Sequence, residues 1–216
     1  MLTFIKVITN MNSRTLSIIV GTGYLIIFVA AIFANFFALE SIIIDPIETV
    51  ENNDIIVRLG IIAFLIIVVF DVVVAWALKE LYRNHPLTVL STYFRMMHAA
   101  LMGVAIFALP LALKKTTTED ILLQVDTFNY IWLIGLFFFG IHILLLSKIA
   151  IVPRFIKVLL ALAGVMYIVD TIAHFLLSNY SDFASIFLIL VAIPSIFGEM
   201  SFALWLLIKG GKAEGK

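Results

Sequence analysis

The stretch that decides the fold is residues 55–82, IIVRLGIIAFLIIVVFDVVVAWALKELY. Within it, residues 59–78 hold a single charged side chain, Asp71, and the others are apolar. A helix needs roughly 20 largely apolar residues to cross a hydrocarbon core about 30 Å thick. The stretch therefore predicts a membrane-spanning helix with one acidic side chain near its middle.

Five more apolar segments, separated by polar or charged turns, predict further spans. Together the six helices are expected at residues 15–39, 55–82, 88–113, 127–149, 155–177 and 184–208. The short turns 83–86 and 152–154 each contain a proline, which starts a helix well and rarely continues one. Helices two and three, and helices four and five, should therefore form antiparallel hairpins. Longer polar stretches at 40–54 and 114–126 join the others.

The composition of the whole chain agrees with this pattern. Of the 216 residues, 63% are hydrophobic and 13% are charged, and the mean hydropathy is +1.18. A soluble domain of this length could not bury so much apolar surface, so a lipid bilayer must cover the rest. We predict an all-α integral membrane protein, a six-transmembrane-helix bundle that forms a single domain over residues 1–216.

Several classes of site are excluded by composition. The chain has no cysteine, which rules out disulfides, thiolate zinc sites and cysteine nucleophiles, so any metal would need histidines and carboxylates. Its 14 basic and 14 acidic side chains balance to a net charge of zero. The chain therefore lacks the basic surface by which proteins bind nucleic acid.

The distribution of lysine and arginine predicts that both ends lie in the cytoplasm (N-in/C-in). One side of the bundle is formed by the N-terminal segment, the two short turns and the C-terminal tail, and it carries Lys6, Arg14, Lys79, Arg83, Lys148, Arg154, Lys157, Lys209, Lys212 and Lys216. The other side carries only Arg58, Lys114 and Lys115. Such a bias in short loops follows the positive-inside rule.

Six ionisable residues are predicted to lie inside the spans, and they form the candidate ligand-binding set: Asp71, Arg95, His98, His142, Asp170 and Glu199. A charge at mid-membrane costs about 2.5–3.5 kcal/mol, so these side chains should face one another or water. From the helical rise of about 1.5 Å per residue, all except Asp170 lie at similar depth in the cytoplasmic half. We therefore expect a central polar cluster, with Asp170 further out.

The charges in this cluster do not balance. Three acids face one arginine, and the excess can be met by protonated carboxyls, by charged histidines or by a bound cation. A metal would have to use His98, His142 and Glu199, but no helix carries a spaced pair of ligands, so no cofactor is predicted. Pro194 should bend its helix and could open a cavity beside Glu199. Tyr24 and Tyr167 either line this cavity or belong to the interfacial aromatic belt.

Motifs along nearly the whole chain resemble a known family. They are Gly23-Tyr24-Leu25-Ile26, Phe94-Arg95, Pro153-Arg154, Ala163-Gly164 with Tyr167 and Asp170, and Gly198-Glu199 followed by Ser201-Phe202-Ala203-Leu204-Trp205-Leu206-Leu207. They resemble the bacterial membrane family catalogued as domain of unknown function 4386, and the last motif is the most specific. That family has an acid where this chain has His98 and a glycine near Lys157. The resemblance implies a six-helix protein of a bacterial inner membrane and supplies no activity.

Three functions fit this sequence. The leading hypothesis is a transporter or sensor that binds a small molecule or ion, in which Arg95 holds a small anionic or lipid ligand and the carboxylates or histidines relay protons. The first alternative is an intramembrane hydrolase or lipid-modifying enzyme with a metal on His98, His142 and Glu199. The second is a structural or accessory subunit, whose polar cluster would be a saturated ion-pair network without a cavity. The sequence leaves open whether the protein is an enzyme.

Overall fold

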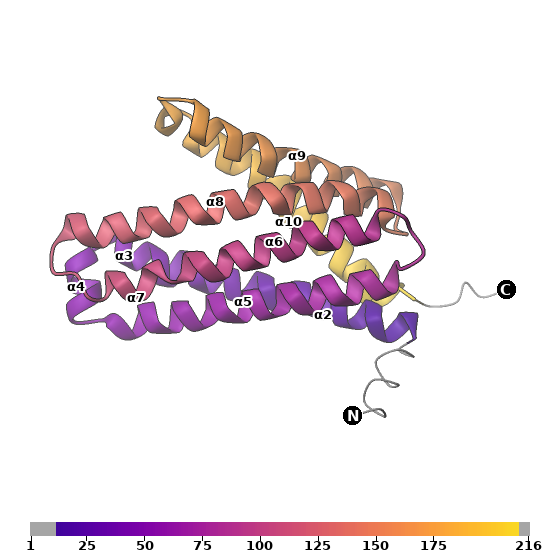
Figure 1. Ribbon diagram of the computed structural model, residues 1–216, viewed down its shortest axis with the longest axis horizontal. Helices are drawn as coiled ribbons and strands as arrows, with labels where there is room; N and C mark the ends of the chain where they lie inside the picture. The colour runs from indigo at the N-terminus through magenta and orange to yellow at the C-terminus, as the bar shows by residue number, and fades with distance from the viewer. Residues whose placement is uncertain (1–11, 212–216) are drawn as a thin grey trace.

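The computed structural model describes residues 12–211 of the chain, and within them it contains helices and no strand (Figure 1). The elements are α2 (Ser13–Phe33), the π-helical η1 (Ala34–Leu39), α3 (Glu40–Ile44), α4 (Pro46–Glu51), α5 (Asp54–Leu81), α6 (Thr88–Ile106), α7 (Ala108–Ala112), α8 (Thr118–Ile149), α9 (Arg154–Leu176), the 3₁₀-helical η2 (Tyr180–Asp182) and α10 (Ala184–Ile208).

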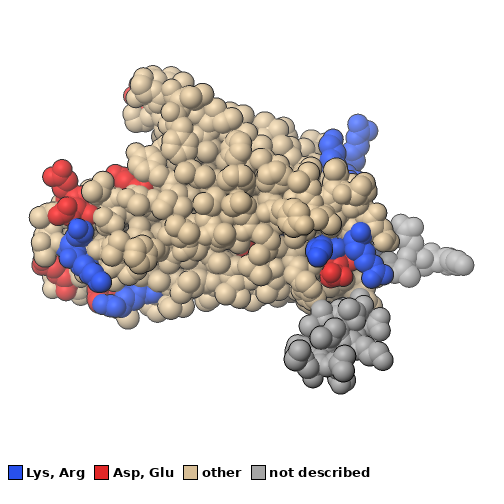
Figure 2. Space-filling view, in the orientation of Figure 1, with Lys and Arg blue, Asp and Glu red and all other residues tan. Residues whose placement is uncertain are grey.

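Six helical segments of residues 12–211 are long and apolar enough to cross a membrane. They are Ser13–Ile44, Asp54–Leu81, Thr88–Ala112, Thr118–Ile149, Arg154–Leu176 and Ala184–Ile208. Figure 2 shows that the charged side chains on this face gather at the two ends of the molecule, with a broad uncharged band between them. The predicted six-helix membrane bundle is confirmed, and the chain is a multi-pass membrane protein.

The six helices form a closed ring in the order of the sequence. Each spanning helix packs on the next, from α2 through α5, α6, α8 and α9 to α10, and α10 returns to pack on α2. Ser13 and Ile208 lie at the same end of the bundle, which we call the termini end, and the α3–α4 segment lies at the opposite, far end (Figure 1). Lys6, Lys212 and Lys216, which entered the count of positive charges, lie outside the described residues.

The fourth spanning helix is longer than predicted, since α8 begins at Thr118 rather than at residue 127. Thr117 caps this helix by accepting a hydrogen bond from the backbone N–H of Asp120 at 3.2 Å. Glu119 and Asp120 also place negative charge in the first turn, where it interacts favourably with the helix dipole. The polar residues from Thr118 onward, which were predicted to form a loop, therefore extend the helix beyond its apolar part.

The polar stretch 40–54, expected as a loop, is also helical. The first span continues through η1 into α3 and ends at Ile44, and Asp45 then caps α4 with Pro46 at its first position. Thr49 and Val50 are buried, and both α3 and α4 pack against α8. A proline after a capping aspartate favours a new helix start, so this segment covers the far end of the bundle.

Close backbone contacts fix the helices that carry the site. A Cβ atom on Gly140 of α8 would lie 2.8 Å from the carbonyl oxygen of Gly164 in α9, so only glycine allows this approach. At the termini end, Arg14 donates hydrogen bonds to the carbonyl oxygens of Leu206 and Gly210, both at 3.0 Å. These bonds satisfy carbonyls at the end of α10 and attach it to α2.

The far half of α10 is packed differently. From Ala184 to Pro194 no residue of α10 is buried, whereas Phe202, Ala203 and Leu206 near the termini end are. Figure 1 shows the α9–α10 hairpin leaning away from the other helices at the far end. Pro194 lies inside the helix and removes one backbone hydrogen bond, as expected for a bend at this point.

Candidate functional site

Arg95 of α6 stands at the centre of the polar cluster and is only 1% exposed. Its Nη2 donates to Asp71 Oδ1 at 2.6 Å, and its Nε donates to the Asp71 carbonyl oxygen at 3.3 Å. Its Nη1 donates to the Tyr24 hydroxyl at 2.7 Å and contacts His142 Nε2 at 3.2 Å. All three guanidinium nitrogens are therefore engaged, and the charge of Arg95 is matched by Asp71.

The contacts of His142 assign its tautomer. Because Arg95 can only donate, His142 Nε2 must be the accepting nitrogen of this pair. The hydrogen of the neutral ring then lies on Nδ1, which contacts the Ser91 carbonyl oxygen at 3.0 Å and Ser91 Oγ at 2.8 Å. His142 is thus a neutral residue that connects Arg95 to the backbone of α6 one turn away.

His98 lies on the other side of Asp71. Its Nε2 is 3.5 Å from Asp71 Oδ2, and its ring packs against Phe139 with 4.7 Å between ring centroids. Within the described residues, Asp71 Oδ2 and His98 Nδ1 are buried atoms without a hydrogen-bond partner. Asp71 therefore has one oxygen fully engaged by Arg95 and one oxygen with only a long contact to His98.

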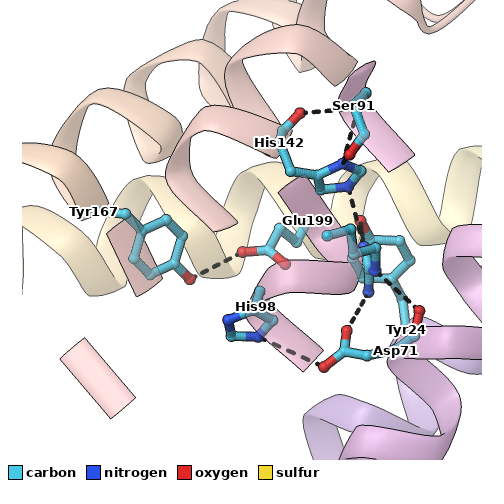
Figure 3. A network of polar contacts seen from close by, with 8 residues as sticks. Tyr24, Asp71, Ser91, His98, His142, Tyr167 and Glu199 are labelled. Atoms are coloured by element: carbon cyan, nitrogen blue, oxygen red, sulfur yellow. Dashed lines mark hydrogen bonds and ion pairs between the residues drawn. The ribbon is translucent and has the colours of Figure 1, made fainter. Parts of the chain in front are cut away.

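Glu199 of α10 has a different environment. Its Oε1 accepts a hydrogen bond from the Tyr167 hydroxyl of α9 at 3.0 Å (Figure 3). Within residues 12–211 Glu199 forms no ion pair, whereas Asp71 is paired with Arg95. Glu199 is also less buried than Asp71, Arg95 and His142.

A cavity of about 190 Å³ lies beside Glu199. All six spanning helices contribute to its walls, which are mostly apolar. Its polar lining includes Asp71, Arg95, His98, Tyr167 and Glu199. The cavity therefore joins the Arg95 network on one side to the Glu199–Tyr167 pair on the other, inside the membrane-spanning part of the protein.

The structure brings five of the six predicted residues around one centre. Asp71, Arg95, His98 and His142 form one contact network, and Glu199 faces the same cavity but bonds to Tyr167 rather than to Arg95. Asp170 lies apart: it accepts a hydrogen bond from the Tyr180 hydroxyl at 2.6 Å and does not line the cavity. The sequence prediction also placed Asp170 apart from the other five residues.

The proposed metal ligands do not converge in the described residues, where no group of three His, Asp or Glu side chains is close enough to hold a metal ion. His142 uses both ring nitrogens for contacts with Arg95 and Ser91. A metal on His98, His142 and Glu199 would require these contacts to be broken.

Sequence reasoning missed several residues of the site, among them Ser91, Trp132 and Ser195. Ser91 holds His142, while Trp132 and Ser195 line the cavity. Ser91 lies four residues before Arg95 and therefore on the same face of α6, a spacing that could have identified it. No comparable spacing identifies Trp132, because an aromatic residue in a membrane helix also suits packing or the interfacial belt.

Comparisons with known proteins cover the same region. The family described as "Domain of unknown function (DUF4386)" matches residues 19–210, which include every residue that lines the cavity. An "Uncharacterized protein" of Archaeoglobus fulgidus is 30% identical over 159 residues, which cover 71% of this chain and 85% of that protein. No solved structure matches the chain.

Proposed function

Because the chain belongs to the family described as "Domain of unknown function (DUF4386)", whose name carries no activity, we propose its function from the cavity. The resemblance inferred from the sequence motifs is thereby confirmed. We propose that the protein binds a small molecule within the membrane, as a transporter or a sensor, and that Glu199 and Tyr167 contact this molecule.

The cavity beside Glu199 is the observation that carries this proposal. Glu199 lies about 14 Å along α10 from Ile208, at the helical rise of about 1.5 Å per residue. An ionisable side chain at such depth costs about 2.5–3.5 kcal/mol and marks a functional position by default. Glu199 faces the cavity without forming an ion pair in the described part of the chain. A bound ligand would give this carboxyl a role that helix packing does not.

Arg95 has a positioning role in this proposal. In the leading hypothesis from the sequence analysis, Arg95 binds an anionic group, but its three nitrogens already donate to Asp71, Tyr24 and His142. Displacing these bonds would leave Asp71 as a buried and unpaired charge, which is strongly unfavourable. The Arg95 network therefore serves as a rigid wall of the cavity, and the ligand contacts the other wall.

The structural alternative explains only half of the site. A subunit that uses its polar cluster for packing would have a saturated ion-pair network and no cavity, and the Arg95–Asp71 side fits that description. The cavity of about 190 Å³ and the free side of Glu199 do not. The hydrolase alternative gains no support, since both ring nitrogens of His142 are engaged.

We also propose where the protein lies and how it is oriented. It lies in a bacterial cytoplasmic membrane, with the termini end facing the cytoplasm. The charge bias and the resemblance to a bacterial family support it. Because the chain lacks cysteine, single cysteines can be introduced at Lys209 and at Glu119, on opposite ends of the bundle. A membrane-impermeant maleimide added to whole cells should label Glu119→Cys alone. Labelling of Lys209→Cys alone would reverse the orientation.

Native mass spectrometry of the protein, purified in mild detergent, tests ligand binding directly. We expect an adduct of defined mass that is lost in Ala31→Phe, because Ala31 lines the cavity and the larger side chain would fill it. Ala100→Phe, an identical change on an exposed lipid-facing position of α6, should retain the adduct. A wild-type protein without any adduct, and without density beside Glu199 in a structure determined in lipid, would overturn the proposal.

A further inference from the structure

The shape and charge of the cavity narrow the class of its ligand. Resting on the proposed function, we infer that the cavity opens to the lipid between α2 and α10, and that its ligand is an amphiphile. The ligand enters from the bilayer and places a cationic, hydrogen-bond-donating head group on Glu199. Its apolar chain stays in the opening between the two helices.

The opening follows from how α10 packs. The contacts that attach α10 to α2 lie near the termini end, where the rings of Tyr24 and Phe202 meet edge to face at 5.7 Å between centroids. Further toward the far end, Ile196 lines the cavity and is 45% exposed. Phe28 and Ala31 of α2 line it from the other side and are partly exposed. The same side chains therefore face the cavity and the lipid.

A proline and the loss of burial mark this part of α10. Pro194 lies next to Ser195 and Ile196 at the cavity, and no residue between Ala184 and Pro194 is buried. Figure 1 shows the hairpin of α9 and α10 leaning away from the bundle on this far side. Exposed apolar side chains lie next to these residues in the sequence, among them Ile193 and Phe197. A lipid chain can pack on such a surface without losing contact with the bilayer.

The cavity volume limits what enters. A dry cavity of about 150 Å³ holds one benzene molecule, whereas sites for drug-sized ligands measure about 300–1,000 Å³. At about 190 Å³, this cavity accommodates a head group of a few heavy atoms. A whole lipid does not fit, so a long apolar chain would have to remain in the opening.

The charge of the head group is inferred from the polar atoms of the cavity that have few or no hydrogen-bond partners within residues 12–211. Asp71 Oδ2 is buried and, among the described residues, has only the 3.5 Å contact with His98 Nε2. Glu199 accepts one hydrogen bond, from Tyr167 to its Oε1. The donors of Arg95 are directed at Asp71, Tyr24 and His142, so the cavity offers acceptors rather than donors. An ammonium group would complement Glu199, whereas a carboxylate would repel it.

Trp132 provides a direct measurement of this binding. It is one of three tryptophans, at positions 76, 132 and 205, and the one that lines the cavity. In a Trp76→Phe, Trp205→Phe background, its fluorescence is titrated in phosphatidylcholine nanodiscs with dodecylamine, dodecanoate and propylamine. We expect saturable binding of dodecylamine, with a Kd at least about tenfold below those of the other two compounds.

Variants separate the head-group contact from general effects of the amine on the bilayer. Glu199→Gln should weaken dodecylamine binding about tenfold or more, since it removes a charge-assisted contact. Glu119→Gln makes the same change on an exposed part of α8 and should leave binding unchanged. Tyr167→Phe retains the carboxylate and should bind with intermediate affinity, which keeps the test usable if Glu199→Gln fails to fold.

Two results would overturn this inference. Dodecanoate binding as tightly as dodecylamine would refute the cationic head group, and propylamine binding as tightly would refute entry from the lipid. If either occurs while the purified protein still carries an adduct that Ala31→Phe removes, only the inference fails. If no adduct is found either, the proposed function fails with it.

Discussion

The two carboxyl groups on opposite sides of the cavity, those of Asp71 and Glu199, have different partners. On one side, Asp71 is paired with Arg95 at 2.6 Å, and Tyr24 and His142 complete the shell of the guanidinium. On the other side, Glu199 has one hydrogen bond from Tyr167 and no ion pair among the described residues. A buried charge that is fully paired holds helices together, whereas a carboxyl that faces a cavity remains free to bind.

The difference also follows the packing of the helices. The Arg95 network joins α2, α5, α6 and α8, each of which packs on the next. Glu199 and Tyr167 belong to α10 and α9, the hairpin that leans away at the far end (Figure 1). We therefore expect substitutions on the first side to change stability and substitutions on the second side to change ligand binding.

Asp71→Ala should have the largest effect on stability. It leaves the Arg95 guanidinium buried without its counter-charge, which costs about 3–5 kcal/mol in the free energy of unfolding. Unfolding by SDS in mixed micelles measures this loss. The double variant Asp71→Leu, Arg95→Met removes both charges and should recover most of it. Equal instability of the single and double variants would show that the pair matters through packing alone.

Tyr24→Phe should have the next largest effect on stability. It removes the hydroxyl that accepts from Arg95 Nη1 at 2.7 Å and keeps the ring 4.8 Å from the guanidinium carbon. We expect a loss of about 1–2 kcal/mol, since the donor is charged and the site is inside the membrane. The same SDS titration serves here. A loss as large as that of Asp71→Ala would mean that the two acceptors share the charge equally.

Tyr167→Phe should cost less stability than Tyr24→Phe. Its hydroxyl donates a single hydrogen bond to Glu199, and hydrogen bonds within membranes average about 0.6 kcal/mol. The measurement is the difference in unfolding free energy between the two Tyr→Phe variants. If Tyr167→Phe is the more damaging of the two, Glu199 is held in place for packing, and the contrast between the two sides is wrong.

Glu199→Gln should have the smallest effect on stability. Glutamine retains an oxygen that can accept from Tyr167, so we expect a change below about 0.5 kcal/mol. Binding of the mass-spectrometric adduct should nevertheless fall sharply. A variant that binds normally but unfolds readily would place Glu199 in the structural network instead.

Much of the fold could be predicted from the sequence. Stretches such as residues 59–78 place a spanning helix wherever the chain stays apolar for about 20 residues. The ends were less predictable, because capping by Thr117 and by Asp45 continued helices into polar segments that hydropathy assigns to loops. Hydropathy indicates only which residues are favourable in lipid, so it cannot predict that a helix continues into polar residues beyond the apolar band.

The sequence by itself determined which side chains would need partners: Asp71, Arg95, His98, His142 and Glu199 lie in apolar helices where an isolated charge is costly. Only the tertiary structure decided how they pair. From depth alone, Arg95 could form an ion pair with either Asp71 or Glu199, since both lie at similar depth on different helices. The packing of α5 on α6 placed Asp71 against Arg95, and the packing of α9 on α10 placed Glu199 beside Tyr167 and the cavity. Depth is set by position along one helix, whereas contact depends on how separate helices pack.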